Sequence, residues 1–318
     1  MNCQLVKRLF WVTSFLIFLI AQIIPGDVCR VILGREAGEG ALRKCRVELG
    51  FVDDNDRRIS AATRYISWLL EFVRGNWGTS FATGEPIQPW VLGRLRNSMM
   101  LGALVLIIAV PLSTFLGVVA GLNEGKLIDT VISVGSLSVV GLPEFITGIL
   151  LINLVAFNVD FIPASSSVPV DSSFREAFPS LILPAITATV VLLAYIVRLT
   201  RAGVVEELKQ PYVRTAELKG LALPAVIYRH ALRNGLLPTI TVVAISVGWL
   251  ISGLVVIENV FNYPGLGRLM VFAIDRRDLP TLQACVMISV VGFAVANMLA
   301  DLLYAALNPR IRASMNGR

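Results

Sequence analysis

The chain of 318 residues is unusually apolar, with 55% hydrophobic and only 16% charged residues. Soluble domains contain about 45–50% apolar and about 25% charged residues, so this composition excludes an ordinary soluble protein and indicates a lipid bilayer as the solvent. The formal net charge is +6. The basic residues concentrate in particular loops instead of forming one basic face, which indicates a topology signal and argues against a nucleic-acid partner.

The first apolar run covers residues 9–24 and is preceded by Lys7 and Arg8. A basic start and an apolar middle also describe a signal peptide, but no small-x-small cleavage site follows. We therefore expect an uncleaved N-terminal transmembrane helix within residues 1–26. Residues 27–98 are rich in acidic, arginine and aromatic residues. Because this segment is not rich in Ser and Pro, it is expected to be a folded hydrophilic insert and not a linker.

The four cysteines show neither metal-ligand spacing nor a C-x-x-C motif, so the sequence predicts no metal site. Cys29 and Cys45 both lie in the hydrophilic insert. They form a disulfide in one interpretation and stay as two free thiols in the other.

Five further apolar runs follow the insert. A spanning helix needs about 20 apolar residues, because about 30 Å of hydrocarbon is crossed at about 1.5 Å per residue. The runs cover residues 99–122, 130–159, 181–197, 236–257 and 280–300. The expected fold is therefore an all-α polytopic membrane protein of about six transmembrane helices, with a five-helix core over residues 99–305 and a tail over residues 306–318.

Basic residues in the short loops predict the orientation. The loop 198–235 holds seven Lys and Arg residues, whereas the loop 160–180 holds one and the loop 258–279 holds three. Short cytoplasmic loops carry an excess of Lys and Arg. We therefore expect both termini and the loop 198–235 to be cytoplasmic, and the insert 27–98 to be periplasmic.

A search for catalytic motifs finds no G-x4-G-K-[ST] phosphate loop, no H-E-x-x-H and no G-x-S-x-G. The single histidine, His230, falls in a cytoplasmic loop. The neighbouring carboxylates of Asp53-Asp54 and of Glu206-Glu207 are interpreted as solvated surface charges, because adjacent residues on a helix do not face each other. The sequence thus predicts no catalytic residue and argues against a membrane enzyme.

Glu144 is the one ionisable side chain well inside an expected span, and it follows Pro143. A charge at the centre of a bilayer costs at least about 2.5–3.5 kcal/mol, so such residues usually face a cavity or the interior of a helix bundle. In one interpretation Pro143 and Glu144 line a translocation path beside a proline kink. In the other, the span is broken and Glu144 reaches an interface.

The loop after the fourth expected span mixes its basic residues with small and apolar ones, which predicts amphipathic helices at the membrane surface. Such helices bind anionic lipid or dock a soluble partner. The loop contains Y-V-R-T-A at 212–216, K-G-L at 219–221, R-H-A-L-R-N at 229–234 and L-L-P at 236–238.

This loop resembles the EAA loop of ABC importer permeases. The resemblance is closest to the oligopeptide/dipeptide branch, which reads roughly D-Y-V-R-T-A-x-x-K-G-L and then R-H-A-L-R-N-x-L-L-P. Pro211 departs from the usual Asp of that branch. Further segments match in the same order, among them I-P-G-D at 24–27, G-N-W-G-T-S at 75–80, L-P-E-F at 142–145, E-N-V-F-N-Y-P-G-L-G at 258–267 and N-P-R at 308–310.

The resemblance implies a permease subunit of an ATP-driven importer in the bacterial inner membrane, with di- or oligopeptides as the substrate class. It implies that this chain binds no cofactor and that ATP is bound by partner subunits. The implied partners are a second permease, usually a different chain, two cytoplasmic ATPases and a periplasmic substrate-binding protein. The residues expected to shape the ATPase-docking surface are Tyr212, Arg214, Ala216, Lys219, Gly220, His230 and Arg233.

Two alternatives remain at this point. Relatives within the branch carry glutathione, nickel complexes or sugars, so the peptide substrate rests on the family alone. A stand-alone secondary transporter is the second functional class, although such proteins usually show internal repeats and several ionisable residues at the midplane.

Overall fold

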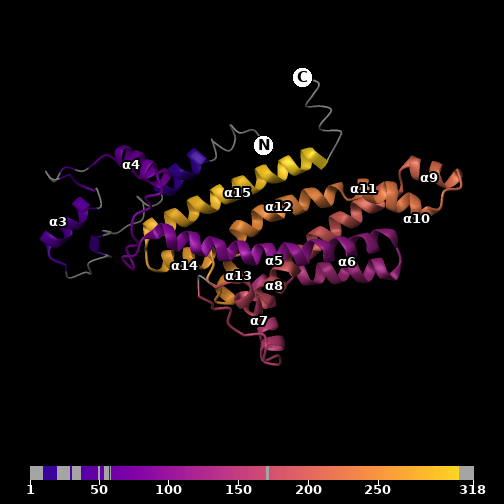
Figure 1. Cartoon of the computed structure of the whole chain (residues 1–318), viewed down its shortest axis with the longest axis horizontal. Helices are drawn as coiled ribbons and strands as arrows, with labels where there is room; N and C mark the ends of the chain where they lie inside the picture. The colour runs from indigo at the N-terminus through magenta and orange to yellow at the C-terminus, as the bar shows by residue number, and fades with distance from the viewer. Residues whose placement is uncertain are drawn as a thin grey trace, which may run out of the picture. The chain divides into compact units, whose positions relative to one another are not determined.

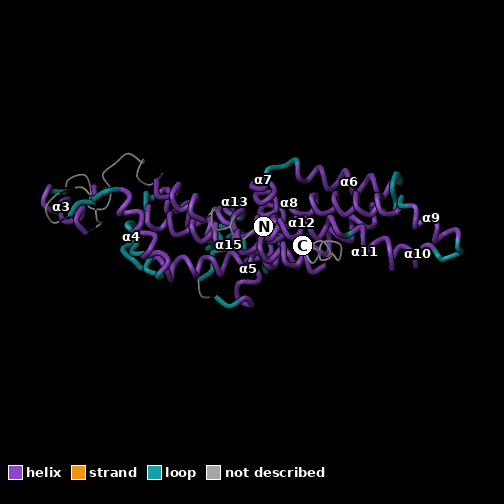
Figure 2. The backbone as a smooth tube through the Cα atoms, turned by 90° about the horizontal axis from the view of Figure 1, so that it is seen from above, coloured by secondary structure: helices purple, strands orange, loops and turns teal. Residues whose placement is uncertain are grey.

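A computed structural model describes residues 10–19, 29–30, 37–48, 51–53, 57, 59–169 and 172–307. Within these residues the structure consists of helices joined by loops, as Figure 2 shows, with an isolated β-bridge between Thr79 and Pro86. The chain divides into two compact units. The first contains Asn2–Arg96 and Gly265–Val291, and the second contains Asn97–Pro264 and Gly292–Arg318.

The first unit is built from short helices and from the first parts of two long ones. They are the apolar helix Phe10–Leu19, α3 (Glu39–Glu48), α4 (Ala61–Val73), the start of α5 (Ile87–Leu122), α14 (Leu266–Asp275) and the start of α15 (Leu279–Leu307). The hydroxyl of Ser60 caps α4 by accepting the Thr63 N–H, which satisfies one free donor at the helix start. Leu69 and Phe72 of α4 enter a buried cluster with Ile87 and Leu269.

Asp278 anchors the turn-rich segment that precedes α5. Its carboxylate is fully buried and accepts hydrogen bonds from the Ser80 hydroxyl, from the Phe81 N–H at 3.1 Å and from the Thr281 hydroxyl at 2.8 Å. A buried carboxylate is tolerated when its oxygens are hydrogen-bonded. Asp278 therefore ties the segment around residue 80 to the turn that leads into α15.

Cys29 is fully buried and disulfide-bonded, so it is not a free thiol. It packs against Leu42 of α3. The side chain of Cys45, the partner in the disulfide interpretation of the sequence, lies outside the described residues.

The second unit is centred on one long helix, α8 (Phe174–Leu208), which contacts α6, α7, α11, α12 and α13 (Figure 1). Its N-terminus is a capping box, in which the Ser173 hydroxyl accepts the Glu176 N–H and the Glu176 side chain accepts the Ser173 N–H. The unit also holds the rest of α5 and α15, α6 (Leu127–Val140), α7 (Glu144–Leu151), the π-helix η1 (Ile152–Ala156), α9 (Pro211–Leu218), α10 (Leu223–Val226), the π-helix η2 (Ile227–Ala231), α11 (Leu232–Gly235), α12 (Leu237–Gly253) and α13 (Val255–Val260).

Glu258, expected in an exposed loop, is instead buried in α13. The Ser98 hydroxyl of α5 lies 2.5 Å from its carboxylate. The Tyr263 hydroxyl donates to the carbonyl of Asn97 at 2.9 Å, and the Asn97 amide donates to the carbonyl of Pro264 at 3.0 Å. Buried polar groups are normally paired in this way, so this cluster fixes the segment after α13 on α5.

Three described helices are long and apolar enough to cross a membrane: Ile87–Leu122, Phe174–Leu208 and Leu279–Leu299. The number rises to five if each of two bent helix pairs counts as one span. Around the expected first span, the structure describes only the shorter apolar helix Phe10–Leu19. The membrane fold is thus polytopic and helical within the described residues.

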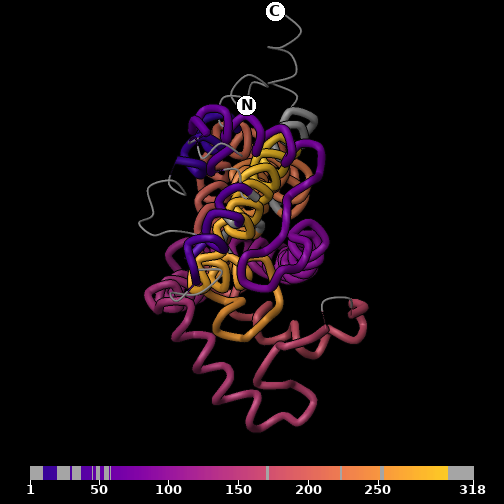
Figure 3. Tube along the Cα trace, turned by 90° about the vertical axis from the view of Figure 1, so that its left-hand side faces the viewer, coloured from indigo at the N-terminus to yellow at the C-terminus, as the bar shows by residue number. Residues whose placement is uncertain are grey.

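The apolar run over 130–159 is broken, as one of the two interpretations of Pro143 and Glu144 expected, and is not one continuous helix. The axes of Leu127–Val140 and Glu144–Ala156 differ by 98°, and Figures 1 and 3 show α7, in pink, turned away from α6. Pro143 is the N-cap of α7. It has no N–H to continue a helix, and it disfavours the α conformation in the residue before it, which explains a break at this point.

Asp278→Ala is expected to destabilise the first unit by about 2–4 kcal/mol, because four donors from Ser80, Phe81 and Thr281 would lose a buried acceptor. Thermal unfolding of the purified protein in detergent would measure this as a lower midpoint. Asp275→Ala is the matched control, since Asp275 is an exposed aspartate at the end of α14, three residues before Asp278. Equal midpoints for the two variants would show that Asp278 is not an anchor.

Candidate coupling site

The segment 198–235 forms the end of α8, the short helix α9, and the run of α10, η2 and α11. Pro211 occupies the first position of α9, where a missing N–H costs nothing because no intrahelical acceptor is available there. The departure from Asp at this position is therefore compatible with a regular helix start. Figure 1 shows α9 beside α10, and the two helices are in contact.

Gly220 ends α9 through a two-bond helix-terminating motif. The Gly220 N–H donates to the carbonyl of Glu217 at 2.9 Å, and the Leu221 N–H donates to that of Ala216 at 3.2 Å. Such a motif needs a left-handed residue, and Gly220 has φ +79°. A Cβ at Gly220 would meet no atom within 4 Å. The glycine is thus needed for its backbone conformation, and its surroundings are open.

Tyr212 and Asn234 both bind Glu207, which joins three helices at the base of the coupling site. The Tyr212 hydroxyl donates to Glu207 Oε1 at 2.7 Å, and the Asn234 amide donates to the same oxygen at 3.0 Å. Burial and the hydrogen bond to Glu207 raise the pKa of Tyr212 to about 12. The phenol is therefore protonated at neutral pH and serves as the donor. The interpretation of Glu207 as a simply solvated charge is wrong.

A glycine pair brings α8 and α11 into backbone contact. A Cβ on Gly203 would lie 2.2 Å from the Gly235 carbonyl oxygen, which no side chain could tolerate. One turn earlier on α8, the hydroxyls of Thr200 and Thr239 form a buried hydrogen bond of 2.8 Å with α12. Small residues and interhelical hydroxyl bonds are typical of close helix packing in membranes.

The same α8 segment also packs on a G-x-x-x-G sequence in α5. A Cβ on Gly117 would lie 2.5 Å from the Thr200 Cβ, and one on Gly121 would lie 2.8 Å from the Val204 Cβ. The G-x-x-x-G spacing places both glycines on one helix face, where they allow close approach. The end of α8 is therefore in close contact with α5, α11 and α12.

Most of the predicted docking residues lie on the surface of this region. Tyr212, Arg214, Lys219, Gly220, His230 and Arg233 are exposed, and Ala216 is half-buried. Val213 is the residue of α9 that is buried, so α9 packs on the protein through Val213 and through the bond of Tyr212 to Glu207, while most of its other residues are exposed.

Three exposed large apolar side chains, Leu218, Leu221 and Tyr228, were not predicted as part of this surface. Leu218, at the end of α9, is 81% exposed, and Tyr228 of η2 is 73% exposed. Large apolar residues left in solvent among basic ones are typical of a protein or membrane contact. The position of Leu218 directly before the K-G pair was the available sequence signal.

Pro143 and Glu144 lie at the break between α6 and α7, in a different part of the second unit from α9 (Figure 1). Glu144 is half-buried in the first turn of α7, where the helix dipole favours a negative charge. The described residues contain no group of three or more His, Cys, Asp or Glu side chains that could hold a metal ion.

Comparison with known proteins places this geometry in context. The family model described as "Binding-protein-dependent transport system inner membrane component" matches residues 113–313. The chain is 34% identical to the "Probable peptide ABC transporter permease protein y4tP" of Sinorhizobium fredii, over 93% of each chain. It is 32% identical to the "Glutathione transport system permease protein GsiC" of Escherichia coli K12, over 97% of this chain and 96% of the relative.

The match covers α6 to α15, including the whole coupling segment, and the relatives align over nearly their full length. The protein therefore belongs to the family of binding-protein-dependent transport system inner membrane components.

Proposed function

We propose that this chain forms one half of the translocation path of an ATP-driven importer and that residues 198–235 dock a separate ATPase. The observation that supports this most directly is the outward-facing α9, which ends at the open Gly220 and carries the exposed Leu218. Tyr212, near the start of α9, donates a hydrogen bond to Glu207 of α8, which also accepts one from Asn234 of α11. A force applied at α9 would therefore reach α8, the central helix of the unit.

The proposed topology has six spans, with the helix around Phe10–Leu19 as the first and each bent helix pair as one span. Both termini and the coupling segment are cytoplasmic in this topology, and the insert 27–98 is periplasmic. The seven basic residues of the segment 198–235 support this orientation.

The proposed assembly contains this chain, a second and different permease, two cytoplasmic ATPases that bind ATP, and a periplasmic substrate-binding protein. The proposed cargo is a short peptide, because the similar proteins are described as peptide and glutathione permeases and glutathione is itself a tripeptide. Pro143 and Glu144 are proposed to face the path; the half-buried state of Glu144 in the first turn of α7 supports this, whereas the break in the helix was expected for an interfacial Glu144.

Co-purification separates this proposal from a secondary transporter. The importer subunit should retain its ATPase chains in mild detergent and should transport only with ATP and binding protein. Uptake by the isolated chain in vesicles with an ion gradient would contradict the proposal.

Gly220→Asp is expected to abolish uptake and ATPase co-purification while membrane insertion stays normal, because a charged side chain would enter the docking surface. Gly84→Asp is the matched control, since Gly84 also has a left-handed φ of +75° and an open surrounding. The control should retain the ATPases. Normal uptake by Gly220→Asp would contradict the assignment of the docking surface.

Leu218→Ala is expected to weaken ATPase binding about tenfold or more, because burying a leucine side chain contributes about 1.5–3 kcal/mol. Binding of the purified ATPase to the permease in lipid nanodiscs measures the dissociation constant. Leu127→Ala tests specificity, since Leu127 is a similarly exposed leucine at the start of α6. An equal effect of both variants would remove Leu218 from the interface.

A further inference from the structure

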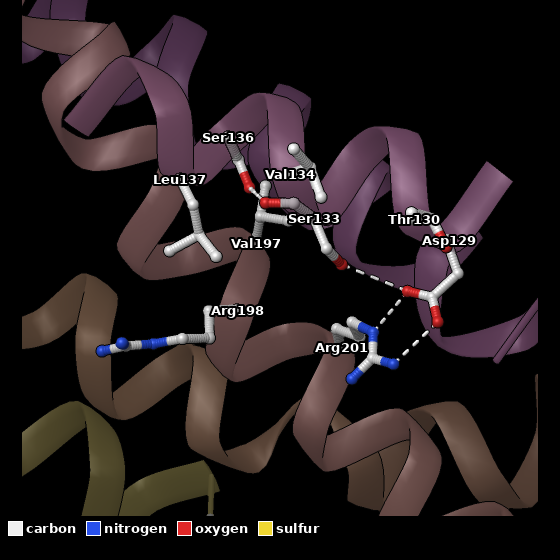
Figure 4. A pocket seen from close by; sticks show the side chains of 9 residues that line it. All are labelled: Asp129, Thr130, Ser133, Val134, Ser136, Leu137, Val197, Arg198 and Arg201. Atoms are coloured by element: carbon white, nitrogen blue, oxygen red, sulfur yellow. Dashed lines mark hydrogen bonds and ion pairs between the residues drawn. The ribbon is translucent and has the colours of Figure 1, made fainter. Parts of the chain in front are cut away.

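Asp129 of α6 and Arg201 of α8 form a two-pronged ion pair, shown in Figure 4. Arg201 Nε lies 2.5 Å from Asp129 Oδ1, and Arg201 Nη2 lies 2.7 Å from Oδ2. The Ser133 hydroxyl donates to Oδ1 at 3.1 Å, and the Gly125 N–H donates to Oδ2 at 2.9 Å. Each carboxylate oxygen thus accepts two hydrogen bonds. The planar guanidinium fixes the angle as well as the distance between the two helices.

The pair is largely withdrawn from solvent, since the side chain of Asp129 is 6% exposed and that of Arg201 is 31% exposed. A buried pair gives little net stability relative to neutral residues of the same shape, but the loss of one partner leaves an uncompensated charge. The contribution of such a pair is therefore better sought in the placement of its two helices than in the free energy of unfolding.

The contact between α6 and α8 differs in kind from the other contacts at this end of α8. The contacts of α8 with α5 and α11 are made at glycines, where not even a Cβ would fit. Between α6 and α8, by contrast, a cavity of about 390 Å³ adjoins the ion pair. It is lined by Asp129, Thr130, Ser133, Val134, Ser136, Leu137, Val197, Arg198 and Arg201 (Figure 4).

Two kinds of attachment follow from this difference. Close-packed glycine contacts make α5, the end of α8 and α11 one block, because interlocked surfaces shift together or not at all. α6 and α8 are in extensive contact, but no glycine interlocks them beside the cavity, and the directed contact there is the ion pair. At this end of α6, Asp129 and Arg201 therefore add a fixed distance and angle to the apolar contacts between the two helices.

We propose that Asp129 and Arg201 are a positioning pair that makes α6 follow α8 when the ATPase moves the coupling site. The inference rests on the proposed function, because it takes the segment 198–235 as the place where force enters. Arg201 lies on α8 a few turns before α9, and Asp129 lies in the first turn of α6. Through α6 the movement would reach the break at Pro143 and the half-buried Glu144 of α7.

A second ion pair joins nearly the same two segments and serves as the matched control. Lys209 Nζ lies 2.7 Å from Glu124 Oε1, but these side chains are 64% and 43% exposed. Exposed pairs contribute about 0–1 kcal/mol and are screened by salt. The control pair is therefore expected to have no part in positioning.

The test uses the complete importer in vesicles, with its ATPases and binding protein, and records ATP hydrolysis and solute uptake together. Asp129→Asn and Arg201→Gln are expected to lower uptake per ATP hydrolysed about fivefold or more, in the range of typical coupling energies. The control variants Glu124→Gln and Lys209→Gln should keep the wild-type ratio. A normal ratio in Asp129→Asn would overturn the proposal.

The double variant Asp129→Asn/Arg201→Gln separates positioning from folding. It leaves no unpaired buried charge at positions 129 and 201. Its thermal midpoint should therefore return towards that of the wild type, while uptake per ATP hydrolysed stays low. A double variant that regains both properties would show that the pair is merely structural, and would overturn the proposal. Retained ATPase co-purification in these variants keeps this result distinct from a failure of the docking assignment.

Discussion

The backbone contact between Gly203 and Gly235 is the constraint on which the coupling region depends. With no side chain on either residue, α8 and α11 approach until a Cβ would overlap a carbonyl oxygen. This approach brings the Thr200 hydroxyl to Thr239 and lets Asn234 reach Glu207. Glu207 in turn binds Tyr212 and so holds α9 at its N-terminal end. The position of the exposed surface of α9 is thus set by contacts among α8, α11 and α12, outside the surface itself.

The coupling region consists of two parts: a closely packed base, formed where α8 contacts α11 and α12, and an exposed rim, formed by the surface of α9 and η2. The base is made of small residues and buried hydroxyls, which exclude alternative packing. The rim carries Leu218, Tyr228 and several cations, which are free to meet a partner surface. Interfaces of this type combine apolar anchors with charges that direct the approach. A transport component without catalytic groups needs both properties, because it must receive a movement at the rim and pass it on through the base.

Much of the coupling region could be predicted from the sequence, because its signals are local. Gly220 was expected within the docking surface, and its left-handed conformation gives the physical reason for glycine there. Hydropathy located the apolar helices, but it could not show that Pro143 separates two helices at 98°. The contacts of Asp129 with Arg201 and of Asp278 with Ser80 were not predictable, since 72 and 198 residues separate the partners. The buried state of Glu258 was missed for the same reason.

The continuity of α8 has a consequence for how this protein can change in evolution. Each residue of an α-helix advances it by about 1.5 Å and turns it by about 100°. A single insertion between Val197 and Thr200 would therefore rotate Arg201 and Gly203 away from Asp129 and Gly235 at once. Insertions and deletions should thus be absent from this stretch of α8 among functional relatives.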